Sequence, residues 1–508
     1  MNMKKKWIIG LSLPVLALIA CGPVEGGEEG NSKGPVASSK TPTDPISVNS
    51  SGGATFTNVE LNVWSVIGEP DNLYLNKVNE AFNVLYKDQI KVNISAIPVQ
   101  TFYTSLANTI QSDPENAPDV VIYHSERLTS FIDNNIIIPL DDYFQYTGTN
   151  FDRNDYLDNV ISECYGYKDN KLYGVPLDVH AGVWFTRSDI LEKNGLAKPT
   201  NLTEFENVCN ALIRLNNEGK MWHRAMNSTT PLATEWTQIK LDDFAPVSMY
   251  AKDNIESGWI PQTAVFQNGG ELVGQNGRPA WKTEGLAKTM TRFRNWKNGT
   301  GYAGKFIADN LDENSIWTNL ASGNAVFTCE GPWWVEKRLD EYEEVLKEKK
   351  DKDGKTYAPL DILNMSKLYA EDASKECANY VYGVGHCFSV TRTCDSNIKR
   401  AAGLLYAQYM TSHSSEYMQG GHLPASKTVL ESKQYKTSSF YNRYLKEFGD
   451  PKNFKMLGRT PYYEEVYGQL KKVYVDTLDN NYKDKSIQQI IDARYSEAIN
   501  AIESKEEL

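Results

Sequence analysis

Two adjacent tryptophans stand at a sharp corner of the chain, where their position suits contact with a ligand. Ala325 to Cys329 is mostly apolar, which predicts a short strand, and Glu330-Gly331-Pro332 ends it because Gly tolerates positive φ and Pro lacks a ladder donor. Trp333 and Trp334 follow at once, where Pro in the first turn favours a helix start. The corner predicts either a flat aromatic wall for a ligand with apolar faces, or a packed corner with one indole half exposed.

The elements that position this corner begin with an alternation of strands and helices. Apolar and polar residues alternate at 59–66 and again at 90–97, and 118–123 is a short apolar run, as in a strand covered on both faces. Helical spacing occupies 75–85 and 102–110 between them. This order predicts an α/β fold with right-handed crossovers.

The ends of these strands supply further candidate ligand contacts. In open α/β sheets, ligands bind beyond the carboxyl ends of the strands. That rule selects Trp64 and Ser65 at the end of the first strand, and Tyr123, Ser125 and Glu126 at the end of the third and directly after it. A helix-capping role is an equally good interpretation of Ser125 and Glu126.

Later segments predict the remaining elements. Strands are expected at 136–140, 172–175, 183–186 and 381–390. Thr203 and Glu206 have capping-box spacing at the start of a helix with a buried stripe, and more helices are expected at 284–296, 397–410, 464–478 and 486–502.

The N-terminus indicates export. Lys4 to Lys6 form a basic region, and the apolar stretch Trp7 to Ala20 is shorter than the roughly 20 residues that span a bilayer. Residues 1–20 therefore predict a signal peptide. Residues 21–55 are rich in Gly, Ser, Pro, Thr and Glu, which predicts a flexible tether. Leu18-Ile19-Ala20-Cys21 resembles the bacterial lipobox, which implies a lipidated Cys21, a protein anchored to the outer face of the membrane, and no spanning helix.

Composition narrows the classes of partner. The rest of the chain is too long for one core, so two lobes are expected. The formal net charge of −12 argues against nucleic acid as a partner and gives no attraction to anionic lipid. No Cys-x-x-Cys pair occurs, so a structural zinc knot is not indicated. We expect neither a metal nor a cofactor. Among the cysteines that follow Cys21, proximity favours Cys387 and Cys394 as a disulfide, with Cys209 and Cys329 as plain buried thiols.

Five stretches together resemble the extracellular solute-binding proteins of carbohydrate ABC importers, the maltose-binding-protein-like family. They lie in that family's order and span nearly all of residues 59–505. They are Asn116-Ala-Pro-Asp-Val-Val-Ile-Tyr-His-Ser-Glu-Arg127, Leu172-Tyr-Gly-Val-Pro-Leu-Asp-Val-His180, Phe266-Gln-Asn-Gly-Gly-Glu-Leu-Val273, the stretch from Ala321 to Trp333, and Ser412 to Ala425.

The resemblance implies a periplasmic-binding-protein fold, with two α/β lobes joined by a hinge and a ligand held between them. The expected lobes are 56–178 plus 381–425, and 179–380 plus 426–508, with chain crossings near 178, 381 and 423–426. Asp178 and His180 would lie at the hinge, with Trp333 and Trp334 facing them. The family often supplies another aromatic where 459–463 falls, and Tyr462 is the candidate there.

Three functions remain open at this point. The leading one is a monomeric, non-enzymatic receptor that delivers a carbohydrate, an oligosaccharide for preference, to an ABC permease. A second is the same fold binding a glycerophosphodiester, which would need cationic or amide donors for phosphate. A third is a secreted glycosidase with Glu126 and Asp178 as its two carboxylates.

Overall fold

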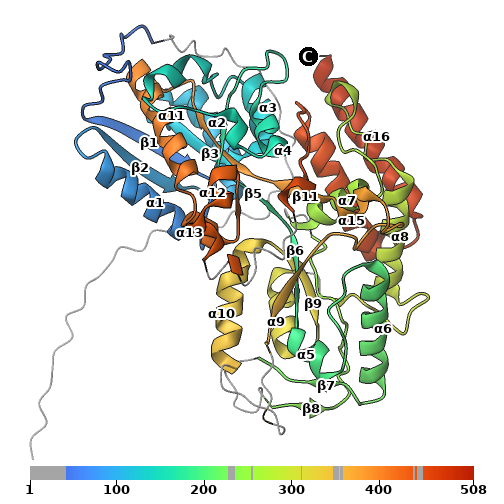
Figure 1. Cartoon of the computed structure of the whole chain (residues 1–508). Coiled ribbons are helices and arrows are strands. Elements are labelled where there is room, and N and C mark those ends of the chain that lie inside the picture. Colours follow the sequence, from blue (N-terminus) through green and yellow to red (C-terminus); the bar gives the residue numbers. More distant parts are fainter. Residues whose placement is uncertain are drawn as a thin grey trace, which may run out of the picture. The chain divides into compact units, whose positions relative to one another are not determined.

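The computed structural model describes most of the chain (Figure 1). The described residues are 42–226, 235–252, 256–309, 312–346, 354, 358–438, 441–442 and 450–507. The predicted signal peptide and Cys21 lie outside them. Residues Ser39–Leu508 form one compact unit, which contains every strand and helix of the described ranges. None of these helices is long and apolar enough to cross a membrane.

The first sheet has five strands in the order β2-β1-β3-β12-β4. The strand β1 pairs in parallel with β2 and β3, whereas β12 runs antiparallel to β3 and β4. The bounds are β1 (Val59–Ser65), β2 (Ile90–Ala96), β3 (Val120–His124), β4 (Val175–Pro176) and β12 (His386–Val390). The predictions at 59–66, 90–97 and 118–123 are confirmed.

Helices with one apolar face cover this sheet. The helix α1 (Asn72–Leu85) packs on β2, and α11 (Asn397–Ser412) packs on β1 and β12. The side chains that α1 buries, among them Leu75, Val78 and Phe82, recur at helical spacing, as the sequence predicts. The other helices of this part are α2 (Val99–Ser112), α3 (Leu128–Asp133), α4 (Asp158–Ile161), α12 (Lys427–Glu431) and α13 (Lys433–Lys436).

A second sheet has three antiparallel strands in the order β10-β6-β9. They are β6 (Val183–Thr186), β9 (Phe327–Glu330) and β10 (Asp361–Asn364). Large aromatic side chains fill the core beside it: Phe205 lies 5.3 Å from Trp184 and 5.0 Å from Phe327 between ring centroids. The remaining α-helices of the described residues are α5 (Ser188–Lys193), α6 (Leu202–Asn217), α7 (Glu256–Gln267), α8 (Glu284–Asn298), α9 (Glu313–Ser322), α10 (Val335–Leu346), α15 (Gln469–Leu478) and α16 (Ile487–Glu506). Among them, α9 packs on β9, and α15 packs on α7, α8 and α16. A two-stranded ribbon of β7 (Trp222–His223) and β8 (Thr237–Gln238) completes the strands of this part.

A third sheet, which we call the connecting sheet, joins the other two. Its order is β13-β5-β11-β14, from β5 (Asp178–Ala181), β11 (Val381–Val384), β13 (Leu423–Pro424) and β14 (Phe454–Lys455). The single residue Leu177 separates β4 from β5, and Gly182 alone separates β5 from β6. The chain therefore runs from the first sheet through the connecting sheet into the second within a few residues.

A glycine makes the other direct passage between sheets. Only Gly385 separates β11 in the connecting sheet from β12 in the first sheet. A Cβ at this position would lie 2.3 Å from the carbonyl oxygen of Asp178. Any larger residue would push β5 away, so Gly385 allows the two strands to approach closely. The predicted strand at 381–390 is thus two strands that belong to different sheets.

Three local predictions are wrong. Residues 172–175 do not form a strand of their own: Val175 opens β4, and Leu172 makes only an isolated bridge to Tyr165. Residues 136–140 form no strand: only Ile137 makes an isolated bridge, to Thr391, and Pro139 has no N–H for a ladder. The helix α6 is not capped by Thr203 and Glu206. Its N-cap is Asn201, whose side chain accepts from the backbone N–H of Glu204.

The predicted disulfide is also wrong, because every cysteine of the described residues is a free thiol. Cys387 lies within β12, which keeps the chain extended up to Val390. That extension carries Cys394 away from Cys387, whereas a disulfide needs Cα atoms about 4.4–6.8 Å apart. Both thiols are buried, as are those of Cys209 and Cys329. They behave as small apolar core residues.

Candidate functional site

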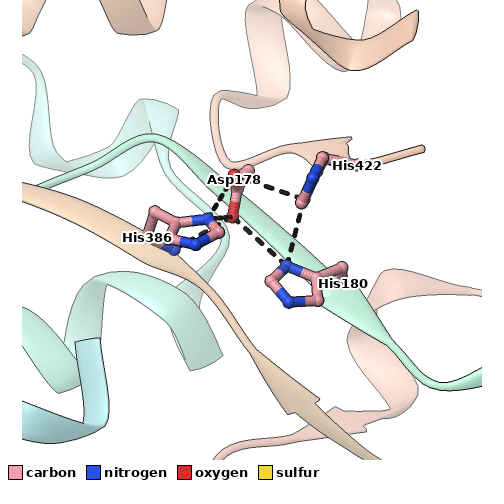
Figure 2. Close-up of side chains that lie close together, drawn as sticks. All are labelled: Asp178, His180, His386 and His422. Atoms are coloured by element: carbon pink, nitrogen blue, oxygen red, sulfur yellow. Dashed lines mark hydrogen bonds and ion pairs between the residues drawn. The ribbon is translucent and has the colours of Figure 1, made fainter. Parts of the chain in front are cut away.

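Four polar side chains meet where the connecting sheet joins the first sheet (Figure 2). Asp178 and His180 project from β5, His386 opens β12, and His422 immediately precedes β13. One ligand-type atom from each lies within 4.8 Å of all the others. The exposed fractions are 0% for Asp178 and His422, 3% for His180 and 6% for His386. We call these four residues the histidine cluster.

The carboxylate of Asp178 is the centre of the cluster. The backbone N–H of His386 donates to its Oδ1 at 2.9 Å, and the hydroxyl of Tyr417 donates to its Oδ2 at 2.8 Å. The ring Nδ1 of His386 lies 2.9 Å from the same Oδ2. The close passage at Gly385 brings β12 near enough for these contacts.

His422 links the cluster to a second carboxylate. Its Nε2 lies 2.8 Å from Oδ2 of Asp71, the residue before α1, and its Nδ1 lies 3.1 Å from Nδ1 of His180. The ring of Tyr417 stacks on the ring of His422 with centroids 5.0 Å apart. Nδ1 of His422 therefore faces the cluster while Nε2 faces Asp71, and in the neutral tautomer with the proton on Nε2 the Nδ1 lone pair is available there.

Burial and mutual charge set the protonation of the cluster. Burial by itself would raise the pKa of Asp178, but His386 and His422 hold it well below its usual range. Burial lowers the pKa of His180 to about 3, so its imidazole is neutral at neutral pH. Burial would also lower the pKa of His422, but Asp178 and Asp71 raise it above its usual value. The cluster holds an ionised carboxylate among imidazoles.

The tryptophan corner contacts this cluster. After β9 the short helical turn η8 (Pro332–Trp334) begins at Pro332, as predicted. The half-buried indole of Trp333 lies edge-on to His180, with centroids 5.7 Å apart, and 5.6 Å from the buried ring of Trp259. The prediction that Asp178, His180 and Trp333 lie together agrees with these contacts.

A glycine turn fixes the approach of the corner to His422. Gly421 has a φ of +95°. A Cβ there would lie 2.2 Å from the carbonyl oxygen of Pro332. Both the left-handed backbone and the close approach require glycine. The turn that carries His422 therefore rests against the backbone that carries Trp333.

Trp334 has a different environment from its neighbour. Its ring lies 6.1 Å from that of Trp317. The charged groups of Lys337 and Arg338 lie 5.1 and 4.8 Å from its centroid. Those contacts involve α9 and α10, so Trp334 anchors the corner, and Trp333 is the indole that reaches the cluster.

Glu126 and Ser125 form a second group of buried polar atoms. Oε1 of Glu126 accepts from the hydroxyl of Tyr463 at 3.2 Å, and the guanidinium of Arg127 stacks 3.7 Å above the ring of Tyr463. Among the described residues, Oε2 of Glu126 and Oγ of Ser125 have no hydrogen-bond partner. A water or a ligand hydroxyl would satisfy these two atoms, as it would the other buried polar atoms without partners in the described residues.

Tyr462, the predicted aromatic near the C-terminus, and its neighbour Tyr463 have different surroundings. The hydroxyl of Tyr462 donates to Glu506 at 2.7 Å, in an exposed contact with the last helix. Its neighbour Tyr463 is buried and contacts Glu126 and Arg127. The π-helical turn η13 (Glu464–Gly468) starts directly after it. Of the two, Tyr463 is the one that lies beside the buried carboxyl of Glu126, and Tyr462 stays a prediction.

The other predicted ligand contacts on the first and third strands, Trp64, Ser65 and Tyr123, lie in different surroundings. Tyr123 is fully buried in the first sheet, where its hydroxyl lies 2.9 Å from Oγ of Ser389. Oγ of Ser65 accepts from the backbone N–H of Ile67 at 3.1 Å, inside its own turn. Trp64 is half buried and packs against the core. The structure thus gives Tyr123 and Ser65 internal roles and brings neither to the histidine cluster.

Sequence reasoning also missed His386 and His422, together with their partners Asp71 and Tyr417. One signal was available: both histidines follow a glycine at a predicted chain crossing, near 381 and near 423. No spacing in the sequence shows that these crossings meet at Asp178. The contact arises from the order of strands in the connecting sheet.

Comparison with known proteins gives a consistent fold and family. A family model described as "Bacterial extracellular solute-binding protein" matches residues 77–440. The GacH receptor of Streptomyces glaucescens, solved alone and with acarbose, is 13% identical, with a TM-score of 0.64 over 87% of this chain and 98% of that one. The sugar-binding protein MalE of Xanthomonas citri is 16% identical, with a TM-score of 0.64 over 88% and 99%. UgpB of Mycobacterium tuberculosis, solved with glycerophosphocholine, is 14% identical, with a TM-score of 0.63 over 88% and 99%. The predicted periplasmic-binding-protein fold is confirmed.

Glu126 makes stability depend on pH. Burial raises the pKa of its carboxyl from 4.5 to about 7. The folded chain therefore keeps this proton between pH 4.5 and 7, where the unfolded chain has lost it, and stability from this group falls as pH rises through that window. We expect the free energy of unfolding of the wild type to fall, relative to Glu126→Gln, by roughly 3 kcal/mol across it.

Urea unfolding of both proteins at several pH values measures this difference. Glu163 is also buried, with a pKa raised to about 7. It is present in both proteins, so its contribution cancels in the difference between their unfolding free energies. Glu115→Gln, at an exposed position, is the control and should follow the wild type. If the unfolding free energies of wild type and Glu126→Gln change in parallel with pH, the pKa of the Glu126 carboxyl is not raised in the folded state.

Proposed function

The chain belongs to the bacterial extracellular solute-binding proteins, and from this premise we propose that it captures an extracellular carbohydrate, an oligosaccharide for preference, and delivers it to an ABC permease. It does so as a monomeric receptor without chemical conversion of the ligand. The carbohydrate lies between two lobes, 56–178 plus 381–438 and 179–380 plus 450–508. The expected division at 425 moves to the end of α13, because Lys427 and Thr428 bond to Asp158 and Asp155 of the first lobe. Support for two lobes comes from the connecting sheet, because the three expected crossings fall on β5, β11 and β13.

The observation that carries the carbohydrate proposal is the half-buried indole of Trp333 beside buried polar groups. An indole offers a flat apolar surface on which the C–H face of a sugar stacks, while polar groups bind its hydroxyls. Trp333 contacts His180, and Ser125 and Glu126 hold buried oxygen atoms that lack partners among the described residues. Two similar structures, the acarbose complex of GacH and the sugar-binding protein MalE, support the same class.

Two alternatives fit the local contacts less well. A glycerophosphodiester has the support of the UgpB structure, but it needs cationic or amide donors for its phosphate. Arg127 is already paired with Glu464 at 2.8 Å and stacked on Tyr463. In a glycosidase, Asp178 would act on substrate, whereas here its oxygens accept from His386 and Tyr417 and are fully buried.

A thermal-shift screen tests the class of ligand. Purified protein is heated with maltose-type and other oligosaccharides, monosaccharides, glycerophosphodiesters and peptides. A ligand that binds only the folded state at 100 times its Kd adds about 2.7 kcal/mol of stability. We expect a rise in Tm with an oligosaccharide. A rise with peptides alone, or with glycerophosphodiesters alone, would contradict the carbohydrate proposal, and sugar products released during the assay would contradict the receptor.

Trp333→Ala tests the proposed contact. Removing the indole takes away the stacking surface, so we expect the affinity for the sugar found in the screen to fall about tenfold or more, which is about 1.4 kcal/mol. Isothermal titration calorimetry measures it. Trp222→Ala, at a half-buried tryptophan of the β7–β8 ribbon, is the matched control and should retain wild-type affinity. Equal sugar affinity in wild type and Trp333→Ala would remove Trp333 from the site.

We also propose that Cys21 carries the lipid that holds the receptor on the outer face of the membrane. Two acyl chains suffice for stable anchoring, whereas one does not. Cys21→Ser should move the protein from the membrane fraction to the soluble extracellular fraction, as detected by immunoblot. Cys377→Ser, which changes a half-exposed thiol of the folded body, should stay with the membrane. Membrane retention of Cys21→Ser would refute lipid attachment at this residue.

A further inference from the structure

We infer that the histidine cluster is a four-ligand binding site for a divalent transition metal of the zinc class, formed by Asp178, His180, His386 and His422. Three imidazole nitrogens and one carboxylate oxygen are a ligand set that suits Zn²⁺. This inference goes beyond the proposed carbohydrate function and does not depend on it. It also replaces the expectation from the sequence that the protein has no metal site.

It is unusual for three histidines to lie so close together in a chain with so few of them. The chain has only 6 histidines. Three of them direct a ring nitrogen to one point, with all four candidate ligand atoms within 4.8 Å. A fourth, His124, lies 4.9 Å from the ring of His386. The residues come from three separate passages of the chain, so local sequence bias does not account for the cluster.

Four separations between candidate ligand atoms, measured to one or the other oxygen of Asp178, are close to those of a tetrahedral site, and the whole set of four lies within 4.8 Å. Bonds of about 2.0–2.1 Å to nitrogen and oxygen place neighbouring tetrahedral ligands roughly 3.3 Å apart. Nδ1 of His422 lies 3.1 Å from Nδ1 of His180 and 3.4 Å from Oδ2 of Asp178. Nδ1 of His180 lies 3.6 Å from Oδ1 of Asp178, and Nδ1 of His386 lies 2.9 Å from Oδ2. These four distances lie on both sides of the tetrahedral value.

The surroundings orient the ligands as metal sites require. Metal-binding histidines usually donate their other ring N–H to a carboxylate, which fixes the tautomer. Nε2 of His422 lies 2.8 Å from Asp71, so a metal on Nδ1 would leave Nε2–H to donate to that carboxylate. The carboxylate of Asp178 is held in turn by the hydroxyl of Tyr417 and the backbone N–H of His386. Asp71 and Tyr417 are therefore positioning residues for the metal.

Burial indicates a structural metal. Structural zinc sites have four protein ligands, whereas catalytic ones keep a position open for water. The four side chains here supply a full set, and none is more than 6% exposed. A metal bound to them would tie β5, β12 and the turn before β13 together, at the place where the connecting sheet meets the first sheet. Entry of the ion requires these passages to separate.

Metal content and binding test the site directly. The purified protein is treated with a chelator, dialysed, and titrated with Zn²⁺ in the absence of sugar. We expect about one Zn²⁺ per chain by mass spectrometry and calorimetry, and a rise in Tm on binding. Co²⁺ in place of zinc should give the intense visible absorption of a tetrahedral centre without a thiolate band. No bound ion, or a Co²⁺ spectrum of six-coordinate type, would overturn the inference.

Variants separate the site from binding elsewhere on the surface. His180→Ala should lose stoichiometric Zn²⁺, and Asp71→Asn, which leaves all four ligands in place, should weaken it by about 10- to 100-fold. His413→Ala, at an exposed histidine stacked on Tyr409, is the matched control and should retain wild-type affinity. Equal Zn²⁺ affinity in wild type, His180→Ala and Asp71→Asn would place the ion elsewhere. If His180→Ala does not fold, the Co²⁺ spectrum of the wild type still tests whether the ion is bound by four ligands of the proposed kind.

Discussion

The buried carboxylate of Asp178 is the interaction on which the junction between the sheets depends. An ionised carboxylate inside a protein is tolerated only when partners replace the water that it has lost. Its partners come from three passages: the N–H and ring of His386, the hydroxyl of Tyr417, and the rings of His180 and His422. Removing any one passage would leave the charge partly uncompensated. The close approach at Gly385 is therefore an electrostatic requirement as well as a packing one.

The same carboxylate determines where the tryptophan corner lies. His180 follows Asp178 by two residues on β5, so it projects from the same face, and its ring meets the edge of Trp333. His422 is held between Asp178 and Asp71, and its preceding residue, Gly421, rests on Pro332. The indole proposed to stack on sugar is thus supported by the group that joins the sheets. A hinge motion that separates Trp333 from His180 must also change the surroundings of the cluster.

Local patterns in the sequence predicted most helices and strands well. They predicted poorly which of these elements contact one another. Alternation and helical spacing located β1, β2, β3 and α1, because the side that a residue faces depends on near neighbours. The features that were not predicted depend on residues that are distant in the sequence. At 136–140 an apolar run finds only one bridge partner, Thr391. Tyr462 and Tyr463 are equivalent by composition, and the packing of the last helix decides which faces Glu126. His386 and His422 were missed because no spacing in one dimension shows which crossings share a sheet.

A metal at the cluster and a sugar at Trp333 would be thermodynamically linked through His180. Binding sites that bias the same conformational equilibrium affect each other's affinity by equal factors. The cluster is complete only while β5, β12 and the turn before β13 are together, and Trp333 contacts that cluster through His180 and through the Pro332–Gly421 approach. An ion that holds the three passages together therefore favours the arrangement in which Trp333 lies against His180. The position of the indole in the sugar complex then sets the sign of this linkage. The ion strengthens sugar binding if the indole lies against His180 in that complex, and weakens it if the indole has moved away.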